Sequence, residues 1–162
     1  THAAHELTTA MTLLSWVKLD SAGAGAHQTA ICKYNAVAGV QKGYIMWVKH
    51  TDVLSCRVGE TTNSTDHAGT TNIQDDTWHL WGLTYDGAFL RLKLDGATEG
   101  TDLAYTNDMT ASGHPLTIGC RQETPSVYDT DMKGVIGESW VYNRALTAGE
   151  NSRHYNLTRW RY

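Results

Sequence analysis

The stretch TWHLWGLTYDGAFLRLKLDGATEG, residues 77–100, decides the fold. Asp86-Gly87 and Asp95-Gly96 each separate two segments of alternating hydrophobicity, and both dipeptides supply the positive φ angles that tight hairpin turns need. Side chains of a strand alternate between its two faces. The middle segment therefore has an inward set and an outward set: Leu90, Leu92 and Leu94 toward the core, and Phe89, Arg91 and Lys93 away from it. The stretch predicts an antiparallel β-meander.

The rest of the chain repeats this strand-and-turn pattern. It contains 15 glycines and many threonines, which favours turns and strands over helices. The predicted strands are Met11–Leu19, His27–Lys33, Tyr44–Lys49, Val53–Val58, Trp78–Tyr85, Phe89–Leu94, Leu116–Cys120 and Val135–Tyr142. The predicted longer loops are Ser21–Ala26, Gly59–Thr70, Thr106–His114 and Gln122–Lys133. This spacing is typical of an all-β, antiparallel two-sheet sandwich.

One helix start is clear, near the C-terminus. Thr147 precedes Glu150 by three residues, the spacing of a capping box in which the hydroxyl and the carboxylate each cap a backbone amide. The segment after it, NSRHYN, has little apolar periodicity. We expect a short helix on the surface.

Bulk composition limits the class of protein. The 162 residues fit a single domain covering 1–162, and the net charge of −4 with 19% charged residues offers no basic stripe for nucleic acid. No apolar run is long enough to predict a membrane span. The three cysteines, Cys32, Cys56 and Cys120, are interpreted as small hydrophobic residues in strands, with a bridge between Cys32 and Cys56 as the alternative.

Four passages carry a resemblance to a known family: MTLLSWVKLD, AICKYN with KGYIMWVK, DDTWHLWGLTYDGAFLRLKLDG, and LTIGCR with GVIGESWVYNRALTAGE. Together they span Met11 to Asn156 and resemble the laminin G-like, concanavalin A-like lectin family in its bacterial and viral form. The resemblance implies a jelly-roll sandwich. It leaves the function open, because the same fold serves lectins, accessory modules of glycosidases, adhesins and virion proteins.

The chain departs from the family pattern in two places. The family usually has Ile-Asp-Glu where this chain has Ile136-Gly137-Glu138, so a carboxylate that lies near calcium in some relatives is missing. The family also usually has an additional strand before Met11. A sheet edge is therefore expected to be unfinished, or filled by the tail LTRWRY or by another chain.

Glu138 is the first candidate for chemistry. A glycosidase needs two carboxylates across one cleft. Side chains at every second position share a face, so Ile136, Trp140 and Tyr142 are expected beside Glu138, and none of them is acidic. The sequence therefore predicts a protein that is not an enzyme.

The aromatic residues on that strand are candidates for ligand binding. If the face is open to solvent, Trp140 and Tyr142 form a platform for a sugar ring, with Glu138 beside them. If the face is covered, Glu138 needs a donor such as Arg144 or a loop amide, because burying it unpaired is costly. Tyr128, in the loop VYDTDMKG, is a further ligand candidate.

The same loop holds the candidate calcium ligands. Asp129 and Asp131 are two residues apart, and carboxylates with loop carbonyls are the oxygen ligands that Ca²⁺ prefers. No other cofactor is predicted.

Taken together, these features predict a non-catalytic recognition or adhesion domain on an exterior surface, extracellular or on a virion, with a carbohydrate as ligand. The alternative is a structural surface protein of a virion or other assembly, such as a decoration or fibre domain, whose partners are neighbouring subunits in an oligomer.

Overall fold

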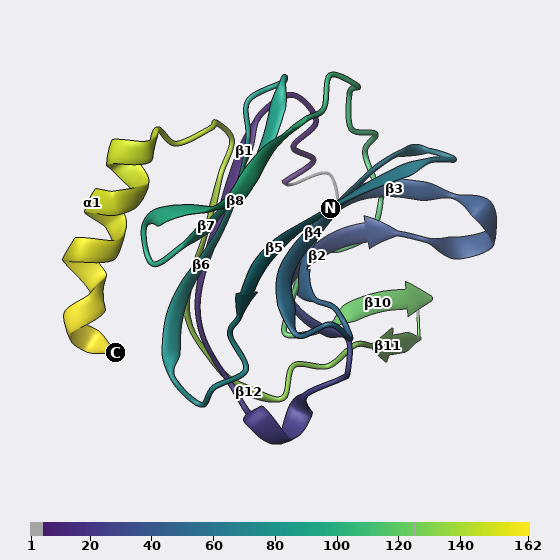
Figure 1. Cartoon of the computed structure of the whole chain (residues 1–162). Coiled ribbons are helices and arrows are strands. Elements are labelled where there is room, and N and C mark those ends of the chain that lie inside the picture. The colour runs from purple at the N-terminus through teal and green to yellow at the C-terminus, as the bar shows by residue number, and fades with distance from the viewer. Residues whose placement is uncertain (1–4, 125) are drawn as a thin grey trace.

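The computed structural model describes residues 5–124 and 126–162. Two five-stranded antiparallel sheets face each other, and a helix lies outside one of them (Figure 1). Sheet A contains, in spatial order, β12 (Gly134–Tyr142), β1 (Met11–Leu19), β6 (Trp78–Tyr85), β7 (Phe89–Leu94) and β8 (Ala97–Ala104). Sheet B contains β5 (Ser64–Asn72), β4 (Val53–Thr61), β3 (Gln41–Val48), β2 (Gln28–Asn35) and β9 (Thr117–Ile118).

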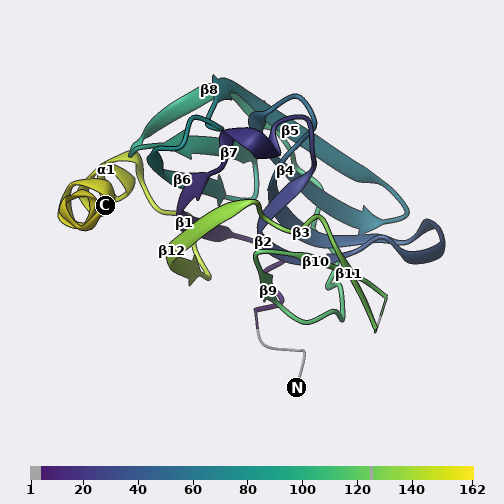
Figure 2. The ribbon, with the colours of Figure 1, turned by 90° about the horizontal axis from the view of Figure 1, so that it is seen from below.

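The smaller elements complete the chain. A hairpin of β10 (Arg121–Thr124) and β11 (Val127–Asp129) lies at the side of the molecule away from helix α1 (Ala148–Thr158), as the view from below shows (Figure 2). Three short 3-10 turns are η1 (Ser21–Gly23), η2 (Val37–Gly39) and η3 (Arg159–Arg161). The predicted all-β, two-sheet jelly-roll-like fold with one short C-terminal helix is confirmed.

The eight predicted strands all exist, and β1, β6 and β7 have the predicted limits. Two predicted loops are wrong. Gly59–Thr70 holds the end of β4 and most of β5, and Gln122–Lys133 holds the β10–β11 hairpin. β8 was also missed. These strands are polar on both faces, so they carry little of the apolar alternation that marks a half-buried strand.

The main core lies between the two sheets. Leu90 and Leu92 face inward as expected and join Trp81, Leu83 and Met46 in a cluster of fully buried side chains. The outward placement of Phe89 and Arg91 is also correct. Lys93 lies on the outer face of sheet A, as expected, but it is only 5% exposed, and it lines a hollow together with the segment before α1.

A second apolar layer joins α1 to the outer face of sheet A. Leu14, Trp16, Leu80 and Leu146 form this cluster, and Trp16 donates from Nε1 to the buried hydroxyl of Thr158 at 2.9 Å. The capping box is present as predicted: the Thr147 hydroxyl accepts from the Glu150 amide, and the Glu150 carboxylate accepts from the Thr147 amide.

The tail does not add a strand to sheet A. Leu157 and Thr158 end α1, and Tyr162 lies against the rings of Trp16 and Trp78, with centroids 4.6 and 4.7 Å away. Of the alternatives for the sheet edge, filling by LTRWRY is therefore wrong, because Tyr162 covers the outer face of sheet A instead.

The cysteines are buried hydrophobic residues rather than a bridge. Cys32 lies on the outer face of sheet B beside Ile45, whereas Cys56 lies in the core opposite Met46. Because the two side chains leave the sheet on opposite faces, the alternative of a Cys32–Cys56 bridge is excluded; both thiols are free, as is that of Cys120. Burial raises the pKa of Cys32 to about 12.

Candidate ligand-binding groove

The structure brings three of the predicted ligand residues together. Glu138, Trp140 and Tyr142 lie on the part of β12 that borders α1, and they line hollows between the strand and the helix. Ile136 does not join them. A β-bulge opposite Trp16 shifts the register, so Ile136 pairs with the inward-facing Val17 and its Cδ1 reaches toward Gly119. The predicted shared face of four residues is wrong at that position.

Two adjoining hollows form what we call the β12–α1 groove. The larger has a volume of about 400 Å³, and the smaller of about 250 Å³. They meet at His154 and Leu157, which line both. The remaining lining residues are Glu138, Trp140, Thr158 and Arg161 in the larger hollow, and Tyr142, Arg144, Leu146, Glu150 and Arg153 in the smaller. The combined size is that of a small-ligand site.

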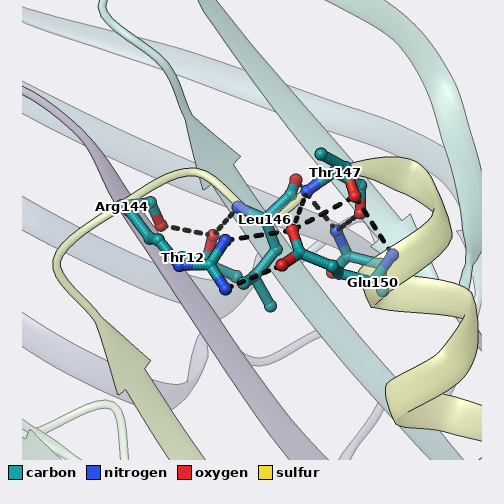
Figure 3. Close-up of polar contacts among 6 residues, drawn as sticks. Thr12, Arg144, Leu146, Thr147 and Glu150 are labelled. Carbon is teal, nitrogen blue, oxygen red and sulfur yellow. Dashed lines mark hydrogen bonds and ion pairs between the residues drawn. The ribbon is translucent and has the colours of Figure 1, made fainter.

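Each hollow contains one aromatic ring and one carboxylate–guanidinium pair. In the larger, Arg161 donates from Nη1 to Glu138 Oε1 at 2.6 Å beside Trp140. In the smaller, Arg144 donates to both oxygens of Glu150, at 2.7 and 3.0 Å (Figure 3). Tyr142 lines the same hollow. Arg144 and the Thr147 amide lower the pKa of Glu150 to about 2. The expected Arg144–Glu138 pair is wrong, because Arg161 takes that place.

His154 separates the two aromatic rings. Its imidazole meets Trp140 edge-on at 4.2 Å and Tyr142 at 6.4 Å between ring centroids. Its Nδ1 is buried and has no hydrogen-bond partner among the described residues. Burial lowers the pKa of His154, which favours the neutral imidazole, although the charge of Glu138 opposes this shift.

Tyr162 explains why glycine replaces the family carboxylate at position 137. A Cβ on Gly137 would come within 2.6 Å of the Tyr162 ring. The Tyr162 hydroxyl also accepts a hydrogen bond from the Glu138 amide at 2.8 Å. The space for an aspartate is therefore occupied by the tail, and the neighbouring Glu138 is held by Arg161 from the same segment.

The other predicted site residues lie elsewhere, on the β10–β11 hairpin. Tyr128 is exposed on β11. Both carboxylate oxygens of Asp129 accept from the guanidinium of Arg121, so a cation there would have to displace an ion pair, and Asp131 is exposed after the hairpin. Across the described residues, no cluster of three or more His, Cys, Asp or Glu side chains is arranged to hold a metal. Calcium binding stays a prediction.

The sequence did not predict the helix side of the groove. His154, Thr158 and Arg161 are spaced by four and three residues, which places them on one face of a helix. That spacing can be recognised in the sequence. The helix contains few apolar residues, however, so the usual periodicity of a buried helix face is weak.

A two-sheet antiparallel sandwich of this topology defines the class of concanavalin A-like β-sandwich proteins. The family model described as "Concanavalin A-like lectin/glucanases superfamily", a laminin G domain model, matches residues 1–150. The chain belongs to this family. A search of curated proteins found no match.

Three solved structures illustrate the likeness of fold. The carbohydrate-binding module of the Ruminococcus gnavus IT-sialidase, bound to α2,3-sialyllactose, has a TM-score of 0.76 at 13% identity, over 94% of this chain and 86% of that chain. A putative carbohydrate-binding protein from Bacteroides ovatus has a TM-score of 0.72 at 14% identity, over 94% of this chain and 42% of that chain. The binding domain of botulinum neurotoxin DC, in complex with rat synaptotagmin II, has a TM-score of 0.67 at 10% identity, over 92% of this chain and 36% of that chain. At identities this low, the likeness shows the fold alone.

In the described part of the chain, no helix is long and apolar enough to cross a membrane.

Proposed function

We propose that this chain is a non-catalytic carbohydrate-recognition domain of an exterior surface and that the β12–α1 groove is its binding site. The observation that carries the proposal is the repeated combination of an aromatic ring with a carboxylate–guanidinium pair, Trp140 with Glu138–Arg161 and Tyr142 with Glu150–Arg144. The apolar face of a sugar ring packs on an aromatic ring. Its hydroxyls donate to carboxylates and accept from guanidinium groups.

The structural neighbours support the ligand class. One is described as a carbohydrate-binding module bound to sialyllactose, and another as a putative carbohydrate-binding protein. Domains of this kind are typically extracellular or surface-exposed, which is the basis for proposing an exterior location.

The groove carboxylates favour binding over catalysis. A general acid near neutral pH needs a raised pKa. Glu150 has the opposite, a pKa lowered to about 2, and Glu138 is held by Arg161. Incubation with the bound glycan should release no reducing sugar; release that Glu138→Gln abolishes would overturn the non-catalytic proposal.

A glycan array followed by titration tests the binding site. Trp140→Ala should weaken binding of an array hit by about tenfold or more, equivalent to about 1.4 kcal/mol. Arg161→Gln, which alters an exposed pair and leaves the apolar layer intact, should weaken it as well. Tyr128→Ala is the aromatic control, because Tyr128 is 52% exposed on β11 and lines neither hollow. Equal affinity of all four proteins would exclude the groove.

The second candidate is an assembly domain that binds further copies of itself, as in a decoration or fibre protein. Leu157 and Trp160 favour it, since they expose large apolar surfaces, 58% and 76%, close together at the end of α1. A mass measurement in solution decides. A stable oligomer that dissociates in Trp160→Ala and binds nothing on the array would replace the carbohydrate proposal.

A further inference from the structure

A third hollow lies on the outer face of sheet A, on the β7–β8 side of the segment that leads into α1. We call it the β7–β8 hollow. Its volume is about 380 Å³, and it touches the smaller hollow of the β12–α1 groove at Leu146. Its polar lining residues are Thr84, Asp86, Arg91, Lys93, Thr98 and Asp102, and residues 145–148 close one side.

Lys93 is the unusual member of this lining. It is only 5% exposed, and its ammonium donates to the Thr98 hydroxyl at 2.7 Å. No other hydrogen bond or ion pair to Lys93 is formed by the residues that the structure describes. An ammonium has three donors, so two of them have no partner within the described chain. Burial lowers its pKa; Asp102 acts in the opposite direction, and Arg91 adds to the lowering.

Spare acceptors lie beside these spare donors. Asp102 accepts from Arg91 Nε through Oδ2 at 2.6 Å, while its Oδ1 has no partner within the described chain. Asp86 accepts from Arg91 Nη1 at 2.5 Å. The Thr84 hydroxyl also lines the hollow without a described hydrogen bond. The two cations and two carboxylates balance in charge.

We propose that the β7–β8 hollow is a second saccharide site that binds neighbouring hydroxyls of a neutral sugar, one hydroxyl accepting from Lys93 and the next donating to Asp102. A hydroxyl can accept and donate at once, which matches a lining that offers both unused donors and unused acceptors. An anionic ligand would satisfy Lys93 but would also meet the carboxylates of Asp86 and Asp102. The charge balance therefore favours a neutral polyhydroxylated ligand.

This second site is independent of the groove proposed above, although it takes the same class of ligand. Its test uses the Lys93 amine as a reporter. The whole protein is acetylated with a limiting amine reagent, with and without the methyl glycosides of glucose, galactose, mannose and N-acetylglucosamine, and modification at each lysine is measured by mass spectrometry. Lys133, which is exposed after the β10–β11 hairpin, is the internal reference.

A glycoside at about ten times its dissociation constant should slow acetylation of Lys93 about tenfold and leave Lys133 unchanged. The protection should persist in Trp140→Ala, which separates this site from the groove. Protection by acetate or phosphate but by no glycoside would overturn the neutral-sugar assignment, and absence of protection by every compound would overturn the site.

A variant gives a second measurement that does not use the amine. Lys93→Met keeps an unbranched apolar stem of similar length and removes the ammonium. It should abolish glycoside-induced changes in the NMR amide signals of Thr84 and Thr98. Lys133→Met should keep those changes. If Lys93→Met does not fold, protection of Lys93 in the unaltered chain decides alone.

Discussion

At the scale of single residues, Tyr162 determines what position 137 can hold. Gly137→Asp restores the carboxylate usual in the family, but its Cβ would lie 2.6 Å from the Tyr162 ring. We expect a loss of about 1–3 kcal/mol in the free energy of unfolding, measured by urea denaturation. Gly149→Asp is the control. No described atom lies within 4 Å of its Cβ, and an acidic residue suits the first turn of a helix.

The same variant, tested without the Tyr162 ring, shows whether that ring or the strand itself causes the loss of stability. In a Tyr162→Ala background, Gly137→Asp should cost less than in the unaltered chain, because the clashing ring is absent. An equal cost in both backgrounds would show that the clash with Tyr162 is not the reason for the glycine.

The pKa values of His154 and His79 should be shifted in opposite directions from the usual value of 6.5. Burial lowers the pKa of His154, so the unfolded chain takes up this proton first, and the protein loses stability as the pH falls below 6.5. The hydrogen bond to Asp95, with help from Asp75, raises the pKa of His79, which stabilises the fold at low pH and loses that effect as the pH rises through its folded pKa.

NMR titration of the histidine ring protons measures both values, with His154→Gln assigning one signal. Glu138→Gln should lower the pKa of His154 further, because it removes the carboxylate that favours the protonated ring. A His154 pKa above 6.5 would mean that the imidazole is not buried against Trp140 as described.

At the scale of elements, the segment between β12 and α1 is held by one buried hydroxyl. Thr12 on β1 donates to the Arg144 carbonyl at 2.9 Å and accepts from the Leu146 amide at 2.8 Å (Figure 3). Thr12→Val removes both bonds at nearly constant volume and leaves a buried amide unsatisfied, so it should cost about 1–3 kcal/mol of stability. Thermal unfolding measures this. Thr9→Val, at an exposed position, should have little effect.

Sequence predicts elements well where alternation, turn residues and caps agree. The Asp-Gly turns gave the limits of β6 and β7, and the Thr147–Glu150 capping box gave the start of α1. β5 could not be read in this way, because His67 is its one buried side chain and its neighbours are polar on both faces. Its strand conformation comes from pairing with β4, a tertiary interaction that local pattern does not contain.

The candidate groove shows the same limit. Alternation along β12 correctly grouped Trp140 and Tyr142, but the bulge opposite Trp16 removed Ile136 from their face. The bulge falls on Gly137 and Glu138, and a glycine inside a strand is a local signal for a bulge that strict alternation ignores. The prediction of Arg144 as the partner of Glu138 was also wrong. Arg144 is six residues away in sequence and Arg161 is 23 away, and only the docking of α1 brings the more distant one close.

At the scale of the whole molecule, the chain has three layers: two sheets and a helical segment that ends in η3 and Tyr162. The core between the sheets includes none of residues 159–162, whereas Tyr162 packs against the outer layer. Removing residues 159–162 should therefore leave a folded sandwich with a damaged third layer. Tyr162 contacts both Trp16 and Trp78, and the loss of two ring contacts should cost about 1–3 kcal/mol.

The chain without residues 159–162 tests whether the outer layer can be damaged while the sandwich stays folded. Its circular dichroism should keep the strand signal, its tryptophan emission should shift to the red as Trp16 and Trp78 meet water, and glycan binding in the larger hollow should be lost with Arg161. Tyr162→Phe is the matched control, since it keeps the ring and removes only the hydroxyl that accepts from the Glu138 amide. If the shortened chain loses all of its strand signal, the third layer is required for the sandwich to fold and not only for its binding groove.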